Sequence, residues 1–396
     1  MRSGFNSSVC AAQVEDLAGG ILRQSLQLID HGYRCTARAL LLVLFFAASR
    51  TASLHDACRR LRQAPCDQAV RDALRGQLPT MAELERRLNR ALQQKLPRSL
   101  KRRRRPMAID LTETCYYGQP YRQQRELRRG KRRQGTTRFH GYATLCVLRR
   151  GERFTVALTY AWKDDSHRAI VQRLLEAARR IGLRPRYLLL DRGFYGLAVV
   201  EQLKGMRCPF LMPVAHRGRR SGKPLAQQSG TRRFLAWKQS GWSEHVMRYQ
   251  GRQSLVKICV AQRPPDRRGK RGRPIVYAYW GLTPPSPAWV RQSYRTRYGI
   301  ESSYRQMNQG RIRTCSRDPW LRLLLMGVAL VLRNVWVYLH RRVLGRVRGR
   351  GIELHPERLR LRTMLLMLQH CAEAGLQCAE GAQLLLDPRP ATDSGP

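Results

Sequence analysis

Acidic residues are scarce in this chain of 396 residues, because 27 Asp and Glu stand against 75 Lys and Arg, for a formal net charge of +48. A positive excess of this size predicts a polyanionic partner, either nucleic acid or an anionic membrane surface. Hydrophobic residues make up 43% of the chain, which is ordinary for a globular protein and excludes a disordered basic tail. At this length we expect two or three domains with a substantial core.

Several signals of other protein classes are also missing. The 11 cysteines include no CxxC pair and no cluster with histidine at zinc spacing, so we expect reduced core thiols. No GxxxxGK[ST] loop is present, which implies no ATP, and no nucleophile elbow supports Ser-His-Asp chemistry. The longest apolar run, Ala39–Ala48, is too short to cross a bilayer. The apolar segment 320–344 contains Arg322 and Arg333 and is expected to be a buried core helix, so no membrane association is predicted.

The first hundred residues have the apolar spacing of helices. Two short amphipathic segments, 53–62 and 66–75, are separated by Ala64-Pro65, with Asp67 as a candidate cap for the second. This pair is equally compatible with a DNA-binding helix-turn-helix and with an ordinary helical hairpin. The basic run 101–105 that follows, which contains Arg102, Arg103 and Arg104, is compatible with a linker, a phosphate-contacting strip or a solvated charge run.

From residue 106 the pattern changes to alternating strands and helices. One strand is predicted to end near Asp110, and two more are joined by a turn at Arg150-Gly151. An amphipathic helix capped by Asp165 or Ser166 comes next, followed by a strand that ends at Asp191, a second helix and a last strand. The order β-β-β-α-β-α-β predicts an α/β fold, with a mixed sheet flanked by helices.

The rest of the chain departs from this alternation. Residues 216–288 contain short strand-like pieces, 289–345 are helical, and 346–396 combine weaker helices with a disordered tail. Three tryptophans of the middle segment could stack on a nucleobase, but core packing is the favoured role for each: Trp237, Trp242 and Trp280. We therefore expect a helical region that is a candidate for DNA binding (1–100) and a core in two parts (106–215 and 289–345). A β-rich insertion (216–288) separates the two parts of the core, and a tail (346–396) follows.

Two of the few acids follow apolar runs at the ends of predicted strands. If the strands that carry Asp110 and Asp191 are neighbours, their carboxylates meet and repel each other unless a cation lies between them. An arginine could supply this charge, and so could a divalent metal, for which hard carboxylate oxygens are suitable ligands. Isolated histidines such as His140 and His167 are expected to be structural or exposed rather than acid–base catalysts.

A third acid lies in the segment "YRTRYGIESSYRQMN", residues 294–308. If this segment is one helix, then Tyr294, Arg297, Glu301, Arg305 and Asn308 share a single face. Such a face is compatible with a metal and phosphate site. It is also compatible with a solvated surface that carries ion pairs four residues apart.

The three acids lie in segments that together resemble the insertion-sequence transposases of the DDE superfamily. The segments are "AIDLTETCYYG", "LLLDRGFYG" and "YRTRYGIESSYRQMN", and the resemblance covers residues from about 106 to 340. The closest group has the signature Tyr-x2-Arg-x3-Glu-x6-Lys. That signature falls here on Tyr294, Arg297 and Glu301, with Asn308 in place of the lysine.

This resemblance implies an RNase H-like core with a β-rich insertion, and Mg²⁺-dependent cleavage at insertion-sequence ends followed by strand transfer. Asp110, Asp191 and Glu301 would hold two Mg²⁺ ions, with Mn²⁺ as a substitute. Tyr294 and Arg297 would contact DNA phosphates. The resemblance also implies a homodimer in the synaptic complex and a prokaryotic cytoplasmic protein associated with the nucleoid. An inactive or repurposed DNA-binding derivative is the alternative, and a host RNase H-like nuclease fits the insertion and the basic N-terminal region less well.

Asn308 generates a first prediction, because asparagine keeps a hydrogen bond but loses the charge of the family's lysine. We hypothesise that Arg305 or Arg311 supplies that charge. The Asn308→Lys variant should then cleave DNA at a rate close to that of the unmodified protein. A large gain in the cleavage rate would contradict this substitution.

Overall fold

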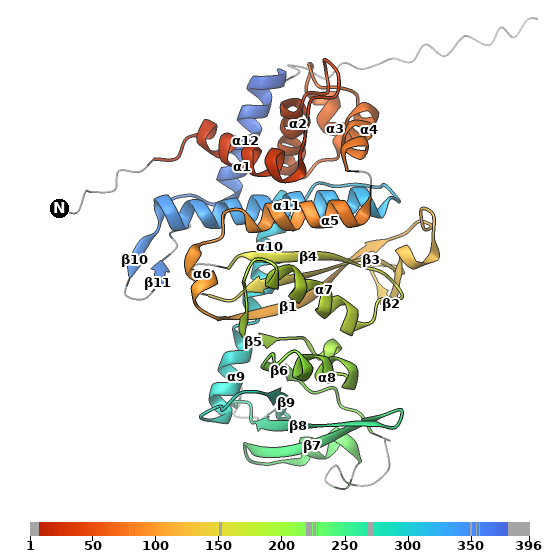
Figure 1. The fold of residues 1–396 in the computed structure, drawn as a ribbon, viewed down its shortest axis with the longest axis vertical. Helices are drawn as coiled ribbons and strands as arrows, with labels where there is room; N and C mark the ends of the chain where they lie inside the picture. Colours follow the sequence, from red (N-terminus) through yellow and green to blue (C-terminus); the bar gives the residue numbers. More distant parts are fainter. Residues whose placement is uncertain are drawn as a thin grey trace, which may run out of the picture.

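A nine-stranded mixed sheet crosses the middle of the protein, with strands in the order β2-β3-β1-β5-β6-β9-β8-β7 and β4 paired to β3 (Figure 1). The strands are β1 (Arg105–Tyr116), β2 (Arg128–Arg133), β3 (Thr136–Val147), β4 (Thr155–Ala161), β5 (Pro185–Leu189), β6 (Phe210–Pro213), β7 (Gly241–Tyr249), β8 (Arg252–Ala261) and β9 (Ile275–Trp280). The computed structural model describes residues 8–78, 80–149, 153–218, 224, 227, 229–265, 267, 272–348, 351–353, 355 and 357–378. The predicted turn at Arg150-Gly151 and the last part of the predicted helical and disordered tail, residues 379–396, lie outside these residues.

The portion β4-β3-β1-β5-β6 confirms the predicted fold class, a mixed α/β sheet flanked by helices. β1 is antiparallel to β3 and parallel to β5, and β5 is parallel to β6. In the β1–β5 pair Ala108 is opposite Leu189, so Asp110 and Asp191 stand at the same level two residues further on. The helix before β5, α7 (His167–Arg179), is capped by Ser166, whose hydroxyl accepts the amide of Ala169.

One strand prediction needs correction, and one strand was not predicted from the sequence. β1 does not end near Asp110 but continues to Tyr116, because β3 pairs with it as far as the Tyr116–Arg138 register. β2 was not predicted, since its sequence is almost entirely basic and five of its six residues are exposed. Pairing with β3 and two ion pairs to Glu113, from Arg128 and Arg133, hold this strand in place. Partner strands, not local apolarity, determine the length of both.

Residues 216–288 contribute β7, β8 and β9 to the same sheet. β9 pairs antiparallel with β6, with Phe210 opposite Trp280, and β8 and β7 follow outward. In Figure 1 these strands lie at the end of the molecule opposite the N-terminal helices. The segment therefore lengthens the central sheet, and α8 (Leu197–Gly205) precedes β6 beside it.

Helices form the other end of the molecule (Figure 1). The predicted helical character of the first hundred residues is confirmed by α1 (Ala11–Leu26), α2 (Ala37–Arg50), α3 (Leu54–Arg60), α4 (Asp67–Gln77), α5 (Met81–Gln93) and α6 (Arg98–Arg102). Asp67 is the first residue of α4, not its cap, because the sulfur of Cys66 accepts the amide of Ala69. α12 (Leu361–Leu376) packs against α1 and α2, so the two ends of the described chain share one core.

The apolar helix α11 (Pro319–Leu339) crosses the face of the sheet beside α5 (Figure 1). With the turn that follows it, the segment Pro319–Leu344 is long and apolar enough to cross a membrane. Within the protein, however, 94% of its most apolar stretch is buried, as predicted for a core helix. Its arginines are paired inside: Arg322 Nε donates to the carbonyl of Ser316 at 2.6 Å.

Side chains from two helices, α5 and α11, seal the free edge of β4. Asn89 of α5 donates to the carbonyl of Leu158 at 2.9 Å and accepts its amide at 2.7 Å. Asn334 of α11 makes the same pair of bonds with Thr155, at 2.7 and 3.0 Å. Because buried backbone groups need partners, these amides replace the strand that is missing at this edge.

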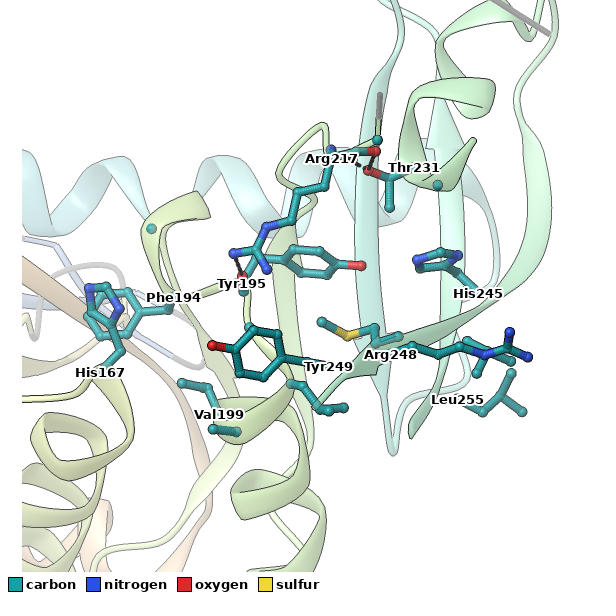
Figure 2. A pocket seen from close by; sticks show the side chains of 18 of the residues that line it. His167, Phe194, Tyr195, Val199, Arg217, Thr231, His245, Arg248, Tyr249 and Leu255 are labelled. Atoms are coloured by element: carbon teal, nitrogen blue, oxygen red, sulfur yellow. Dashed lines mark hydrogen bonds between the residues drawn. The ribbon is translucent and has the colours of Figure 1, made fainter. Parts of the chain in front are cut away.

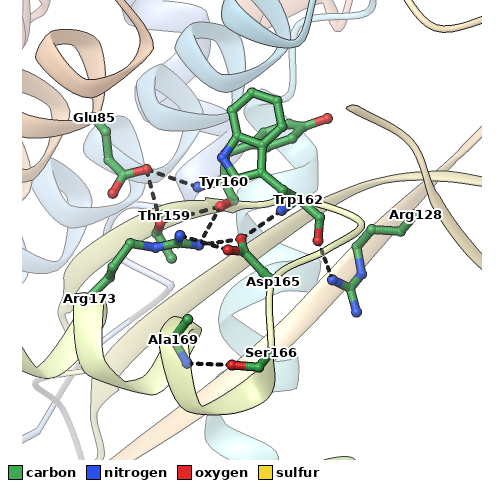
Figure 3. A network of polar contacts seen from close by, with 9 residues as sticks. All are labelled: Glu85, Arg128, Thr159, Tyr160, Trp162, Asp165, Ser166, Ala169 and Arg173. Carbon is green, nitrogen blue, oxygen red and sulfur yellow. Dashed lines mark hydrogen bonds and ion pairs between the residues drawn. The ribbon is translucent and has the colours of Figure 1, made fainter. Parts of the chain in front are cut away.

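Figure 3 shows the end of β4, where the network extends to α7. The Glu85 carboxylate accepts from the Thr159 hydroxyl and the Tyr160 amide, and burial raises the pKa of Glu85. Arg173 forms an ion pair with Asp165 and donates to the carbonyl of Tyr160 at 3.0 Å. The network fixes α7 against the sheet directly before β5.

We predict that Asn89→Leu, a change of similar volume, lowers the free energy of unfolding by about 2–4 kcal/mol, because two buried backbone groups lose their partners. Urea unfolding followed by circular dichroism measures the change. Arg90→Leu, at an exposed position on the same helix, serves as control and should shift stability by less than about 0.5 kcal/mol. Equal stability of the two variants would mean that the Asn89 bonds do not close the strand edge.

Candidate active site

Three carboxylates from distant parts of the chain converge on one arginine. Arg297 Nη1 lies 3.3 Å from Asp110 of β1, and Arg297 Nη2 lies 3.0 Å from Glu301 and 3.8 Å from Asp191, which follows β5. Parallel pairing of β1 with β5 places the two aspartates, and α10 (Tyr298–Met307) supplies Glu301. The structure therefore brings together the three predicted acids. Of the two cations that the sequence left open, it shows an arginine between them.

The site is charged and only partly open to water. The Arg297 side chain is 12% exposed, that of Asp110 17%, and that of Asp191 50%. Burial, with the Asp191 and Glu301 charges, raises the pKa of Asp110 to about 6, although Arg297 opposes the shift. Burial disfavours the charged form of Arg297, but Tyr294 and the surrounding carboxylates outweigh this and raise its pKa. The arginine is thus a permanent cation that stabilises closely spaced acids.

The prediction of one helix through residues 294–308 is wrong. α9 (Pro287–Arg295) and α10 are separate, because the amides of Thr296 and Arg297 bond three residues back, to Ser293 and Tyr294, and tighten the chain into a turn. Arg297 lies at the start of α10 and so does not share a helix face with Tyr294. The turn directs its side chain inward, to the carboxylates.

Two tyrosines fix the backbone beside the aspartates. The Tyr294 hydroxyl donates to the carbonyl of Leu190 at 3.3 Å, directly before Asp191. The Tyr304 hydroxyl lies 3.4 Å from the carbonyl of Asp110 and 2.6 Å from the Thr144 hydroxyl. Burial raises the pKa of both tyrosines, so both stay protonated and able to donate. The role of Tyr304 was not predicted, although it stands three residues after Glu301.

An arginine-rich cavity of about 1240 Å³ opens beside the carboxylates. Asp191 is at its wall, and the rest includes α9, the start of α10, the end of β6, the loop after β8 and the start of β9. Its lining includes five arginines and three tyrosines, which are Arg192, Arg263, Arg291, Arg295, Arg297, Tyr277, Tyr294 and Tyr298. Positive side chains at this density suit a phosphate backbone. Only Tyr294 and Arg297 among them were predicted to contact DNA, since the others belong to no motif.

A second cavity, of about 860 Å³, lies beyond the loop that follows Asp191 (Figure 2). The starts of α7 and α8 and strand β7 form its walls. Arg217, which follows β6, and Tyr249, the last residue of β7, both reach the cavity. The Tyr195 hydroxyl on its wall is buried and has no hydrogen-bond partner among the described residues. None of the three tryptophans singled out in the sequence is part of this lining.

The remaining predicted DNA contacts lie on the surface. Arg305 and Asn308 are exposed at the end of α10, and Arg102, Arg103 and Arg104 are exposed at the end of α6 and just before β1. Arg104 lines a separate cavity of about 600 Å³ with Arg179, Arg184 and Arg207. Their part in DNA binding stays a prediction.

The carboxylates fit a divalent cation by their chemistry, since hard oxygen ligands suit Mg²⁺ or Mn²⁺. As they are placed, no group of three or more His, Cys, Asp or Glu side chains within the described ranges is arranged to hold a metal ion. The Arg297 guanidinium lies among the three carboxylates.

Comparison with known proteins identifies the class. Residues 101–334, more than half of the chain, match the family described as "Transposase DDE domain", so the chain belongs to that family and is a DNA transposase. The chain is also similar in fold to the structure titled "Cryo-EM structure of piggyBac transposase synaptic complex with hairpin DNA (SNHP)". That similarity has a TM-score of 0.49 at 10% identity, over 97% of this chain and 77% of the other. No curated protein sequence matches.

The two histidines considered in the sequence do not touch the carboxylates. His140 is buried in β3 with Nδ1 2.7 Å from the Tyr160 hydroxyl, and burial lowers its pKa to about 3. The His167 ring packs against Phe194, with ring centroids 4.9 Å apart, at the second cavity. Both contacts agree with the predicted structural role.

His140 generates a pH prediction. Its pKa in the folded state lies below the ordinary value of 6.5, so the unfolded chain binds the proton first, and stability is lost as the pH falls below about 6.5. We expect His140→Asn to be less stable at neutral pH. Between about pH 6.5 and pH 5, the free energy of unfolding of this variant should fall by about 2 kcal/mol less than that of the unmodified protein. Urea unfolding at both pH values measures the slope, and exposed His370→Asn is the control. An unchanged slope would show that His140 does not titrate in this way.

Proposed function

We propose that this transposase catalyses Mg²⁺-dependent cleavage of DNA at the ends of an insertion sequence and transfers the cut strand to target DNA. Three carboxylates that converge on one cation, with one of them, Asp191, at the wall of an arginine-lined cavity, are the observation that carries this proposal. Separated strands and helices supply them, so their meeting is a product of the whole fold. Divalent metals are general in the family, and Mn²⁺ should substitute for Mg²⁺.

The chain's own residues divide the work by position. Asp110 is held deep in the sheet, whereas Asp191 and Glu301 are more open, with 50% and 37% of their side chains exposed. We assign all three as ligands of two metal ions, which when bound activate the attacking oxygen and stabilise the leaving oxygen. The arginines of the cavity bind the phosphates on either side of the cut and bring the scissile bond to Asp191.

The proposal extends to the partners and the setting. A second copy of the chain would join it in a synaptic complex that holds both ends of the element. The basic N-terminal helices and Arg102–Arg104 would bind the DNA outside the cavity. The reaction uses no ATP and no membrane, and it takes place at the nucleoid in the cytoplasm of a prokaryote.

Asp191→Asn tests the proposal, because it removes one ligand charge while keeping the size of the side chain. We predict at least an approximately hundredfold loss of Mg²⁺-dependent cleavage, given that metal stabilisation of transition-state charge is worth several kcal/mol. The substrate is a DNA fragment that carries the sequences flanking the coding gene, and binding is followed by mobility shift. Asp72→Asn, exposed on α4, should cleave normally. Cleavage by Asp191→Asn at the normal rate contradicts the assignment, and DNA binding without cleavage by the unmodified chain favours a repurposed DNA-binding protein.

A further inference from the structure

We infer that Arg297 holds the place of the catalytic cations in the DNA-free protein and leaves it when DNA phosphates bind, so that DNA and metal promote each other's binding. This inference rests on the proposed function, because it concerns the same three carboxylates. It assigns Arg297 as a positioning residue with two alternative sets of partners.

The first step is geometric. One guanidinium lies within 4 Å of oxygens from Asp110, Asp191 and Glu301, and the Arg297 side chain is only 12% exposed. Mg²⁺ binds carboxylate oxygens at a distance of about 2.0–2.1 Å. The oxygens would have to close on a centre that the nitrogens of Arg297 now occupy, so the arginine and the metals exclude each other.

The second step is electrostatic. Without a cation, three carboxylates that approach one another around a single guanidinium repel each other. The arginine therefore keeps the acids together before a metal arrives. A divalent ion placed beside a guanidinium would be repelled in turn, so metal binding in the free protein must include the work of moving Arg297.

The third step gives the arginine a destination. Arg297 also lines the arginine-rich cavity, and its guanidinium lies 5.7 Å from the centre of the Tyr294 ring on that side. A phosphate in this cavity would offer two oxygens to the planar guanidinium, the geometry that arginine binds best. DNA can thus withdraw Arg297 from the carboxylates while the chain keeps its backbone in place.

Thermodynamic linkage makes the effect reciprocal: if DNA raises the affinity for metal, metal raises the affinity for DNA by the same factor. For a metal-dependent nuclease, this linkage limits cleavage activity to the DNA-bound state. The complete metal site forms chiefly where a phosphate backbone already lies in the cavity.

The test measures Mn²⁺ affinity of the full chain without DNA, by electron paramagnetic resonance of free Mn²⁺. Arg297→Gln removes the competing charge and should bind Mn²⁺ at least about tenfold more tightly than the unmodified protein, within the usual range of coupling. Arg297→Lys keeps the charge and should resemble the unmodified protein. Arg90→Gln is the control, since it removes the same charge at an exposed position on α5, and it should bind Mn²⁺ like the unmodified protein. Equal or weaker Mn²⁺ binding by Arg297→Gln overturns the inference.

A second measurement needs no variant and stays informative if Arg297→Gln fails to fold. Adding a pre-cut duplex end, with the Mn²⁺ bound by DNA alone subtracted, should raise the Mn²⁺ affinity of the unmodified protein at least about tenfold. The absence of such a rise overturns the inference. The metal site itself is checked separately with Asp191→Asn. If Asp191→Asn abolishes Mn²⁺ binding and Arg297→Gln leaves it unchanged, the inference about Arg297 is refuted but the proposed metal site is not. Mn²⁺ binding insensitive to Asp191→Asn, with or without DNA, refutes the proposed function.

Discussion

Closely spaced carboxylates repel one another unless a proton or another positive charge lies among them, and the site of this transposase depends on that constraint. Arg297 supplies the charge, with nitrogens 3.0–3.8 Å from all three acids. Arginine is abundant in this chain, and the turn between α9 and α10 directs Arg297 to the three acids. The other arginines near the site line the cavity and remain available to phosphate. One charge balance thus links the acids, the turn and the DNA-binding surface.

The fold positions these charges through a few backbone relations. Parallel pairing of β1 with β5 sets Asp110 level with Asp191, and the hydroxyls of Tyr304 and Tyr294 approach the carbonyls beside them. β4, on the far side of β3, is closed by amide side chains of α5 and α11 instead of by another strand. Since α11 is buried along its length, the helical half of the molecule supports the sheet that carries the site.

Much of this was predictable where local pattern and structure agree. The apolar run before Asp191 predicted a buried strand, and the three acidic motifs predicted which carboxylates would meet. The sequence also required a cation between the aspartates but could not choose between arginine and metal, because that depends on the direction of one side chain. The break before α10 escaped prediction, since Thr296 and Arg297 are compatible with a continuous helix and tertiary contacts bend the chain. β2 escaped it as well, because pairing with β3 outweighs its basic composition. The cavity arginines come from separate segments with no shared motif, so only the folded chain brings them together.

The most direct measurement of the central claim is the anomalous scattering of Mn²⁺ in crystals of the transposase bound to a pre-cut DNA end. The account predicts Mn²⁺ peaks among Asp110, Asp191 and Glu301, with the Arg297 guanidinium turned to a phosphate in the arginine-rich cavity. Crystals without DNA, at the same Mn²⁺ concentration, should show Arg297 among the carboxylates. Mn²⁺ bound elsewhere, or Arg297 unmoved beside a fully occupied metal site, would contradict it.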